Sequence, residues 1–140
     1  MNVITKMLIS SADEAGFFGK LGRYFASPQI RRECGGYPLN DGADYRWLVA
    51  MNKRDLRVVA FLSIEHKTDM IVLRNGYVEP EWRGKGVFRE LLRQALHYID
   101  HHHLPALGNL PAASAAALKK LGFRAVSKRG AWVKIERIAR

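Results

Sequence analysis

The stretch "VEPEWRGKGVFRELL", from Val78 to Leu92, has a glycine pair where an extended segment becomes a helix. Glycine weakens a helix, so Gly84 and Gly86 at this threshold indicate a role other than stability. The backbone N–H groups of such a turn point outward at the positive end of the helix dipole, where they can bind phosphate. Three basic side chains flank the glycines: Arg83, Lys85 and Arg89. The turn is therefore predicted to hold a phosphate group.

Two common nucleotide-binding motifs do not fit this turn. A Walker A loop needs Ser or Thr after its lysine, whereas Lys85 is followed by Gly86. A dinucleotide fingerprint needs a third glycine at the position that Arg89 occupies, and it begins with a βαβ crossover instead of hairpins. The phosphate must therefore belong to another kind of ligand.

Strand and helix patterns extend outward from the turn in both directions. From Val87 onward, apolar residues repeat at helical spacing with charged residues opposite, and Pro80 ends the strand before the turn. Strands are expected at 3–9, 45–52, 56–67, 70–78, 104–110, 123–129 and 131–138, and further helices at 11–26, 27–34 and 111–122. The predicted order is β-α-α-β-β-β-α-β-α-β-β, with a loop over 35–44.

The composition limits the class of protein. A chain of 140 residues with 48% hydrophobic content suits one folded domain, expected over residues 1–140. Cys34 is the only cysteine, which excludes a disulfide framework and favours a cytoplasmic setting. The sequence contains no recognisable signal peptide or membrane span. We therefore expect no membrane partner, and either a monomer or a homodimer.

The charge of the chain is strongly positive. There are 23 Lys and Arg against 13 Asp and Glu, which gives a formal net charge of +10. Such a surface attracts polyanions, so nucleic acid is a candidate partner. The alternative is a cationic surface that serves only solubility.

The stretch Val78–Leu92 resembles the acetyl-CoA signature of the Gcn5-related N-acetyltransferases (GNAT), in which V-x-P leads into R-G-x-G and a helix. The matching residues are Val78, Pro80, Trp82, Arg83, Gly84, Lys85 and Gly86. A second signature of the family, a helix ending in K-x-G-F, is matched by "ASAAALKKLGF" at 113–123. Two motifs in the correct order are more specific than either alone, and the resemblance covers roughly residues 45 to 138.

The resemblance implies a mixed α/β (α+β) fold with a mostly antiparallel central sheet and flanking helices. It also implies an N-acyltransferase that moves an acetyl or other acyl group from CoA to an amine by direct attack, without an acyl-enzyme. A main-chain N–H near Val78 is then expected to polarise the thioester carbonyl. The expected acetyl-CoA-binding residues are Val78, Arg83, Gly84, Lys85, Gly86, Val87, Phe88, Arg89 and Asn109.

The sequence departs from the family pattern at the residues expected to move protons. Leu118 stands where the family often has a tyrosine acid, so Ser114 is the candidate hydroxyl donor, with a helix-opening role as the alternative. The strand that ends at Val78 contains no carboxylate, so Glu65 of the neighbouring strand is the candidate base. His66, Asp69 and a water relay are the alternatives. Glu79 and Glu81 are expected to be solvated. Phe88 replaces a small residue, and its ring must enter the core or shape the acyl pocket.

The acceptor is expected to bind at the early helices and the loop that follows them. Candidate contacts are Tyr37, Asp44, Tyr45 and Trp47, because aromatic rings and carboxylates can hold a cationic amine or a base. The positive charge favours an amine carried on nucleic acid, aminoacyl-tRNA or an acidic protein. A small-molecule amine, a protein N-terminus or lysine, and a non-catalytic nucleic-acid-binding module are the alternatives.

Two histidines at helical spacing, His97 and His101, are the one pattern that points to a metal ion. No cysteine or carboxylate signature accompanies them, and histidines near a helix C-terminus interact favourably with the dipole. No metal is therefore expected.

Overall fold

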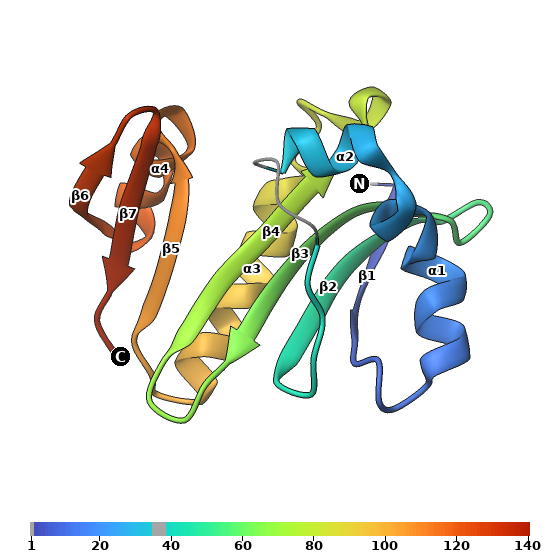
Figure 1. Cartoon of the computed structure of the whole chain (residues 1–140), viewed down its shortest axis with the longest axis horizontal. Coiled ribbons are helices and arrows are strands. Elements are labelled where there is room, and N and C mark those ends of the chain that lie inside the picture. The colour runs from blue at the N-terminus through green and yellow to red at the C-terminus, as the bar shows by residue number, and fades with distance from the viewer. Residues whose placement is uncertain (1, 35–38) are drawn as a thin grey trace.

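The computed structural model describes residues 2–34 and 39–140, and these contain seven strands in one sheet of order β1-β2-β3-β4-β5-β7-β6 (Figure 1). The strands are β1 (Val3–Leu8), β2 (Tyr45–Asn52), β3 (Val58–His66), β4 (Ile71–Val78), β5 (Ala106–Pro111), β6 (Arg124–Arg129) and β7 (Trp132–Arg137). The helices are α1 (Glu14–Ala26), α2 (Pro28–Glu33), α3 (Val87–His101) and α4 (Ala112–Leu118), with short 3₁₀ turns η1 (Pro80–Trp82) and η2 (Lys119–Leu121). The predicted order of strands and helices is confirmed.

The helices cover the sheet from two sides. Figure 1 shows α1 next to β1 and α2 near the end of β4, with α3 and α4 behind the sheet. On the near face Phe17, Leu21 and Tyr24 of α1 pack with aromatic residues of β2 and β3. On the far face the predicted apolar stripe of α3 is buried together with residues of α4, β5 and β7. The mixed fold with a mostly antiparallel sheet is therefore also confirmed.

Strands β4 and β5 form the one parallel pair among the described strands, and it is short. Their ladder joins Ile71 to Ala106 and Val72 to Leu107, after which the two strands diverge (Figure 1). Beyond Val72 the edge of β4 that faces β5 has no strand partner among the described residues. Backbone groups on this edge are available to a ligand.

A bulge in β4 lies where the two strands separate. Leu62 is opposite Gly76 and Ile64 is opposite Leu73, so β4 has one more residue than β3 between these pairs. The Oγ of the fully buried Ser63 accepts a hydrogen bond from the N–H of Asn75 at 3.0 Å, which satisfies the backbone that the bulge leaves unpaired. A bulge bends its strand and increases its twist. It therefore helps to turn β4 away from β5.

An ion pair attaches strands β5, β7 and β6, which lie beyond the divergence from β4, to helix α3. Arg137 of β7 is buried and donates to Asp100 of α3, with an Nη1–Oδ1 distance of 2.6 Å. The hydrogen bond from Arg137 holds the pKa of the Asp100 carboxyl below its usual value. α3 therefore supports strands on both sides of the divergence.

Helix boundaries differ from the sequence expectation where capping decides them. α1 begins at Glu14 instead of residue 11, because the Asp13 carboxylate accepts a hydrogen bond from the N–H of Gly16. α4 ends at Leu118 and continues as η2 until Gly122, whose positive φ of 94° stops it. In the described part of the chain, no helix is long and apolar enough to cross a membrane.

Candidate acyl-CoA site

The glycine turn has the conformation that the sequence suggested. Gly84 and Gly86 have φ of 74° and 82°, a region that side-chain-bearing residues rarely adopt. Gly86 is the N-cap of α3, and no side chain caps the first turn of that helix. The first N–H groups of a helix lack intrahelical partners, so those of the α3 start are available to an anion. A Cβ built on Gly84 meets no heavy atom within 4 Å, so the turn is also sterically open.

A cleft lies in the gap between β4 and β5, and Arg83 and Phe88, which come directly before and shortly after the turn glycines, line it. Its volume is about 530 Å³, and residues of α2, β4, β5, α3 and α4 line it. Five of the residues singled out in the sequence lie together in its lining: Val78, Arg83, Phe88, Asn109 and Ser114. Residues of both predicted motifs therefore line the same cleft.

Arg83 is directed toward the end of β4 and not along the glycine turn. Its Nε donates to the Val78 carbonyl at 2.8 Å, and its Nη2 lies 3.5 Å from the carboxylate of Glu33. The guanidinium also lies over the ring of Tyr77, 5.5 Å from its centroid. In this arrangement Arg83 connects the last residues of β4 to the end of α2. The Nζ of Lys85 lies over the Trp82 ring, 5.4 Å from its centroid.

Phe88 narrows the cleft at Gly76. A Cβ on Gly76 would lie 2.6 Å from Cε1 of Phe88, so the ring rests directly on the glycine backbone. Phe88 also packs against the core while it lines the cleft. The ring thus packs against the core and lines the cleft at the same time, and the absence of a side chain at residue 76 makes room for it.

The candidate acid and base occupy different positions relative to the cleft. Ser114 is exposed and lines the cleft beside the buried Leu118, where a hydroxyl can reach a ligand. Glu65 is not among the lining residues, and its carboxylate accepts hydrogen bonds from Nε and Nη2 of Arg74 at 3.0 and 2.5 Å. His66 bonds to the Tyr98 hydroxyl of α3, on the other side of the sheet from α1. None of these contacts brings a base to the cleft.

Glu33 was not singled out in the sequence, yet it is the one acidic side chain lining the cleft among the described residues. It is the last residue of α2, and Arg83 and Tyr77 lie beside it. Burial, and then the charge of Glu33 and a hydrogen bond with it, raise the pKa of the Tyr77 hydroxyl, which therefore stays neutral. No local signal marks Glu33, because the fold of α2 over β4 brings it to the cleft.

Cys34 also lines the cleft but is not activated. Its Sγ lies 3.8 Å from the Gly76 carbonyl oxygen. Burial, and then the charge of Glu33, raise the pKa of the thiol to about 11. Because the thiolate is the nucleophilic form, this environment does not favour an acyl-cysteine.

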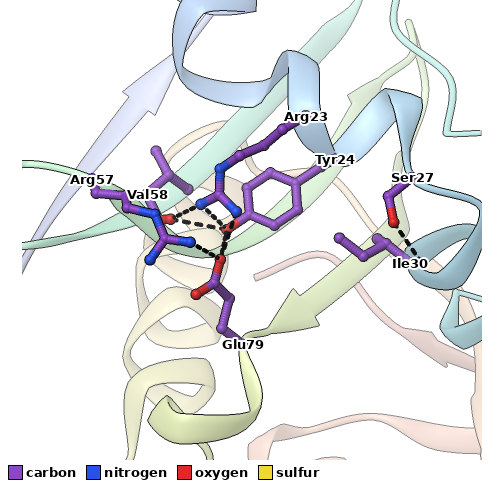
Figure 2. Close-up of polar contacts among 7 residues, drawn as sticks. All are labelled: Arg23, Tyr24, Ser27, Ile30, Arg57, Val58 and Glu79. Atoms are coloured by element: carbon purple, nitrogen blue, oxygen red, sulfur yellow. Dashed lines mark hydrogen bonds and ion pairs between the residues drawn. The ribbon is translucent and has the colours of Figure 1, made fainter.

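The expectation that Glu79 is solvated is wrong. Its side chain is only 8% exposed, and its Oε1 accepts hydrogen bonds from Arg23 at 2.7 Å, Tyr24 at 2.9 Å and Arg57 at 3.2 Å (Figure 2). Arg23 and Tyr24 also donate to the Val58 carbonyl. Burial alone would raise the pKa of Glu79, but the bonds from Arg23 and Tyr24 and the nearby arginine charges outweigh it and lower the pKa. This cluster anchors α1 to the residue that follows Val78, which itself lines the cleft.

The described residues expected to bind the acceptor do not form an exposed surface together. Trp47 is fully buried, and its Nε1 donates to Asp41 at 2.9 Å, so it has no surface with which to contact a substrate. Its inclusion among the acceptor residues is therefore wrong. Tyr45 is nearly buried in the core beneath α1, and Asp44 is exposed. Tyr37 lies outside the described residues.

The histidines of α3 do not form a metal site in the described part of the chain, where no three His, Cys, Asp or Glu side chains lie close enough to hold an ion. The ring of His102, which follows α3, lies edge-on to His66 and at a tilt to Tyr98. The candidate site thus consists of the glycine turn and the cleft.

The comparison with protein families agrees with this geometry. The model of the acetyltransferase (GNAT) family matches residues 10–123, which include the glycine turn, strands β2 to β5 and all the cleft-lining residues except Trp132. The chain belongs to the GNAT family. It is accordingly an acyl-CoA-dependent N-acyltransferase, and the family uses acetyl-CoA. A search of curated proteins finds no significant match.

Solved structures show the same fold at low sequence identity. ElaA from Escherichia coli superposes with a TM-score of 0.77 at 18% identity, over 96% of this chain and 99% of that one. The ribosomal-protein-S18-alanine N-acetyltransferase from E. coli has a TM-score of 0.69 at 16% identity, over 99% and 95%. An N-acetyltransferase from Thermoplasma acidophilum in complex with coenzyme A has a TM-score of 0.65 at 14% identity, over 99% of each chain.

Proposed function

We propose that this GNAT protein binds acetyl-CoA through the turn 84–89 and transfers the acetyl group directly to an amine. The observation that carries the proposal is the uncapped start of α3 behind two positive-φ glycines, between Arg83 and Phe88, which both line the cleft between β4 and β5. The N–H groups of this turn would hold the pyrophosphate. The side chains of Lys85 and Arg89 supply charge next to them.

The chain contributes chiefly position and polarisation to the reaction. Backbone N–H groups on the open edge of β4 near Val78 would stabilise negative charge on the thioester oxygen. The neutral amine nitrogen then forms the C–N bond as the C–S bond breaks, and the product nitrogen loses a proton while the thiolate gains one. We assign the donor role to Ser114, because its hydroxyl lies in the cleft. Glu33 is a better candidate than Glu65 to receive the proton, directly or through water, because Glu33 lines the cleft, whereas Glu65 does not and is paired with Arg74.

We further propose that the amine is carried on a polyanion in the cytoplasm. The net charge of +10 is more than one CoA requires, and it favours nucleic acid over a small neutral amine. The runner-up is acetylation of a protein N-terminus, which has support from the shared fold with the S18-alanine N-acetyltransferase.

Isotopically labelled acetyl-CoA tests this assignment against three acceptor classes: aminoacyl-tRNA, a small polyamine and a ribosomal peptide with a free N-terminus. We expect label on the aminoacyl-tRNA, and none with uncharged tRNA, because only the former carries a free α-amine. Label on the peptide alone would support the runner-up. RNA binding without acetyl-CoA binding would indicate the non-catalytic module.

A further inference from the structure

The sheet beyond the cleft has one face that the described helices leave uncovered. α1 and α2 pack against residues of β2 to β4. In Figure 1, α4 lies behind β5 and β7. Along β7, Val133, Ile135 and Arg137 are buried on the side of α4, while Trp132 and Lys134 alternate with them and point outward. Trp132 is 41% exposed, although tryptophan is mostly buried in folded proteins.

Two cations lie on the same face as this tryptophan. In the β6–β7 ladder Arg129 is opposite Trp132, and Lys134 is opposite Ser127. Residues directly opposite in an antiparallel pair share a face, so Arg129 and Lys134 flank the indole. Among the described residues, neither Arg129 nor Lys134 takes part in an ion pair, whereas Arg124 on this face is paired with Glu136. The charge of these two side chains is therefore available to a ligand.

This face is continuous with the cleft. Trp132 lines the cleft, and so does Asn109, which is exposed and lies opposite Lys134 in the β5–β7 ladder. The start of α3 belongs to the far side of the sheet, so the phosphates of an acyl-CoA would be held on the side opposite Trp132. An acceptor that attacks from the free side of the cleft would pass over this tryptophan.

We propose that this surface, which we call the Trp132 face (Arg129, Trp132 and Lys134), binds the single-stranded end of the nucleic acid that carries the acceptor amine. A base stacks on the indole, and neighbouring phosphates contact Arg129 and Lys134. An acidic peptide could pair with Arg129 and Lys134, but a chain of carboxylates has no flat ring to stack on the indole. A surface with both an exposed indole and two cations that are unpaired among the described residues therefore favours nucleic acid. The proposal rests on the proposed function, and it adds the class of acceptor and the place where it binds.

The probe is a fluorescently labelled single-stranded RNA of about eight nucleotides, the length of one binding site in other single-strand-binding proteins. We expect Trp132→Ala to weaken binding about 5- to 150-fold, the loss that removal of one stacked base gives. Trp132→Phe should keep most of the affinity, because the phenyl ring still stacks. The double charge reversal Arg129→Glu with Lys134→Glu should weaken binding and lower the salt slope by about 1.4, at about 0.7 per lost phosphate contact.

The matched control is Lys53→Glu with Arg54→Glu, which changes the net charge equally at the exposed turn between β2 and β3. We expect this control to weaken RNA binding much less than the charge reversal on the Trp132 face does. Thermal unfolding of each variant shows whether it is folded. The proposal is overturned if wild-type protein does not bind the RNA, if Trp132→Ala and the control bind alike, or if a poly-aspartate peptide competes as well as RNA.

Titration with acetyl-CoA separates failure of this proposal from failure of the proposed function. If acetyl-CoA binds and a small amine is acetylated while RNA does not bind, the Trp132 face is wrong and the acetyltransferase assignment stands. If acetyl-CoA itself does not bind, the proposed function fails, whatever the RNA result.

Discussion

Replacement of Gly84 by alanine separates the binding role of the glycine turn from its contribution to stability. In the free protein the new Cβ meets no heavy atom within 4 Å, so the cost to folding comes only from the φ of 74°. A residue with a Cβ in this left-handed region costs about 1–2 kcal/mol. This leaves the variant folded, because domains have about 5–15 kcal/mol of stability.

The effect of Gly84→Ala on acetyl-CoA binding should be larger than the strain alone explains. The methyl group would occupy space through which a phosphate approaches the backbone N–H groups. Loss of one hydrogen bond to a charged group costs about 1.5–3 kcal/mol, which corresponds to about a 10- to 150-fold higher Kd. Isothermal titration with acetyl-CoA measures this change, and urea unfolding measures the stability.

Gly130 provides the matched control, because it has a φ of 61° and equally open surroundings in the β6–β7 turn. Gly130→Ala should lose a similar amount of stability and keep its affinity for acetyl-CoA within about twofold, less than 0.5 kcal/mol. Equal Kd values for wild type, Gly84→Ala and Gly130→Ala would refute the assignment of the phosphate to this turn.

Three further predictions concern two residues that line the cleft, Cys34 and Phe88, and the buried Glu79, which follows Val78 in the sequence. Cys34→Ala should leave turnover within a few-fold, with intersecting initial-velocity lines; parallel lines or an acyl-cysteine in the intact mass would show a covalent mechanism. Phe88→Ala should open the cleft above Gly76 and raise kcat/KM for butyryl-CoA relative to acetyl-CoA by about tenfold, since one methylene in an apolar pocket is worth about 10-fold or more; an unchanged ratio would place the acyl group elsewhere. Glu79→Ala should cost about 1–3 kcal/mol of unfolding free energy at pH 7. The folded pKa of Glu79 lies below the unfolded one, so this contribution is present above the unfolded pKa and is lost as pH falls through the folded pKa. Urea unfolding of both proteins at neutral and acidic pH measures this, and a loss that does not shrink in acid would contradict the assigned pKa shift.

The features predictable from the sequence are those that local patterns determine. The spacing of apolar residues after Val87 predicts α3, and the glycines before it predict a turn with positive φ. Pro80 predicts the end of β4, which the structure places at Val78. The order of the elements follows from such signals together, and the two motifs add the family.

The remaining features depend on residues far apart in the chain. Glu79 is buried because Arg23, 56 residues away, and Arg57, 22 residues away, fold against it. β2 is apolar on both faces, so its sequence does not distinguish a buried Trp47 from a tryptophan that faces a ligand. Likewise, the exposure of Trp132 follows from the absence of a described helix over β7, and no local pattern reveals it.

The most direct test of the account is a crystal structure of the protein with CoA. We predict that the pyrophosphate accepts hydrogen bonds from backbone N–H groups within residues 84–89, and that the thiol end lies between β4 and β5 near Val78. A cleft that stays empty at saturating CoA, or a CoA whose phosphates lie away from this turn, would contradict the account.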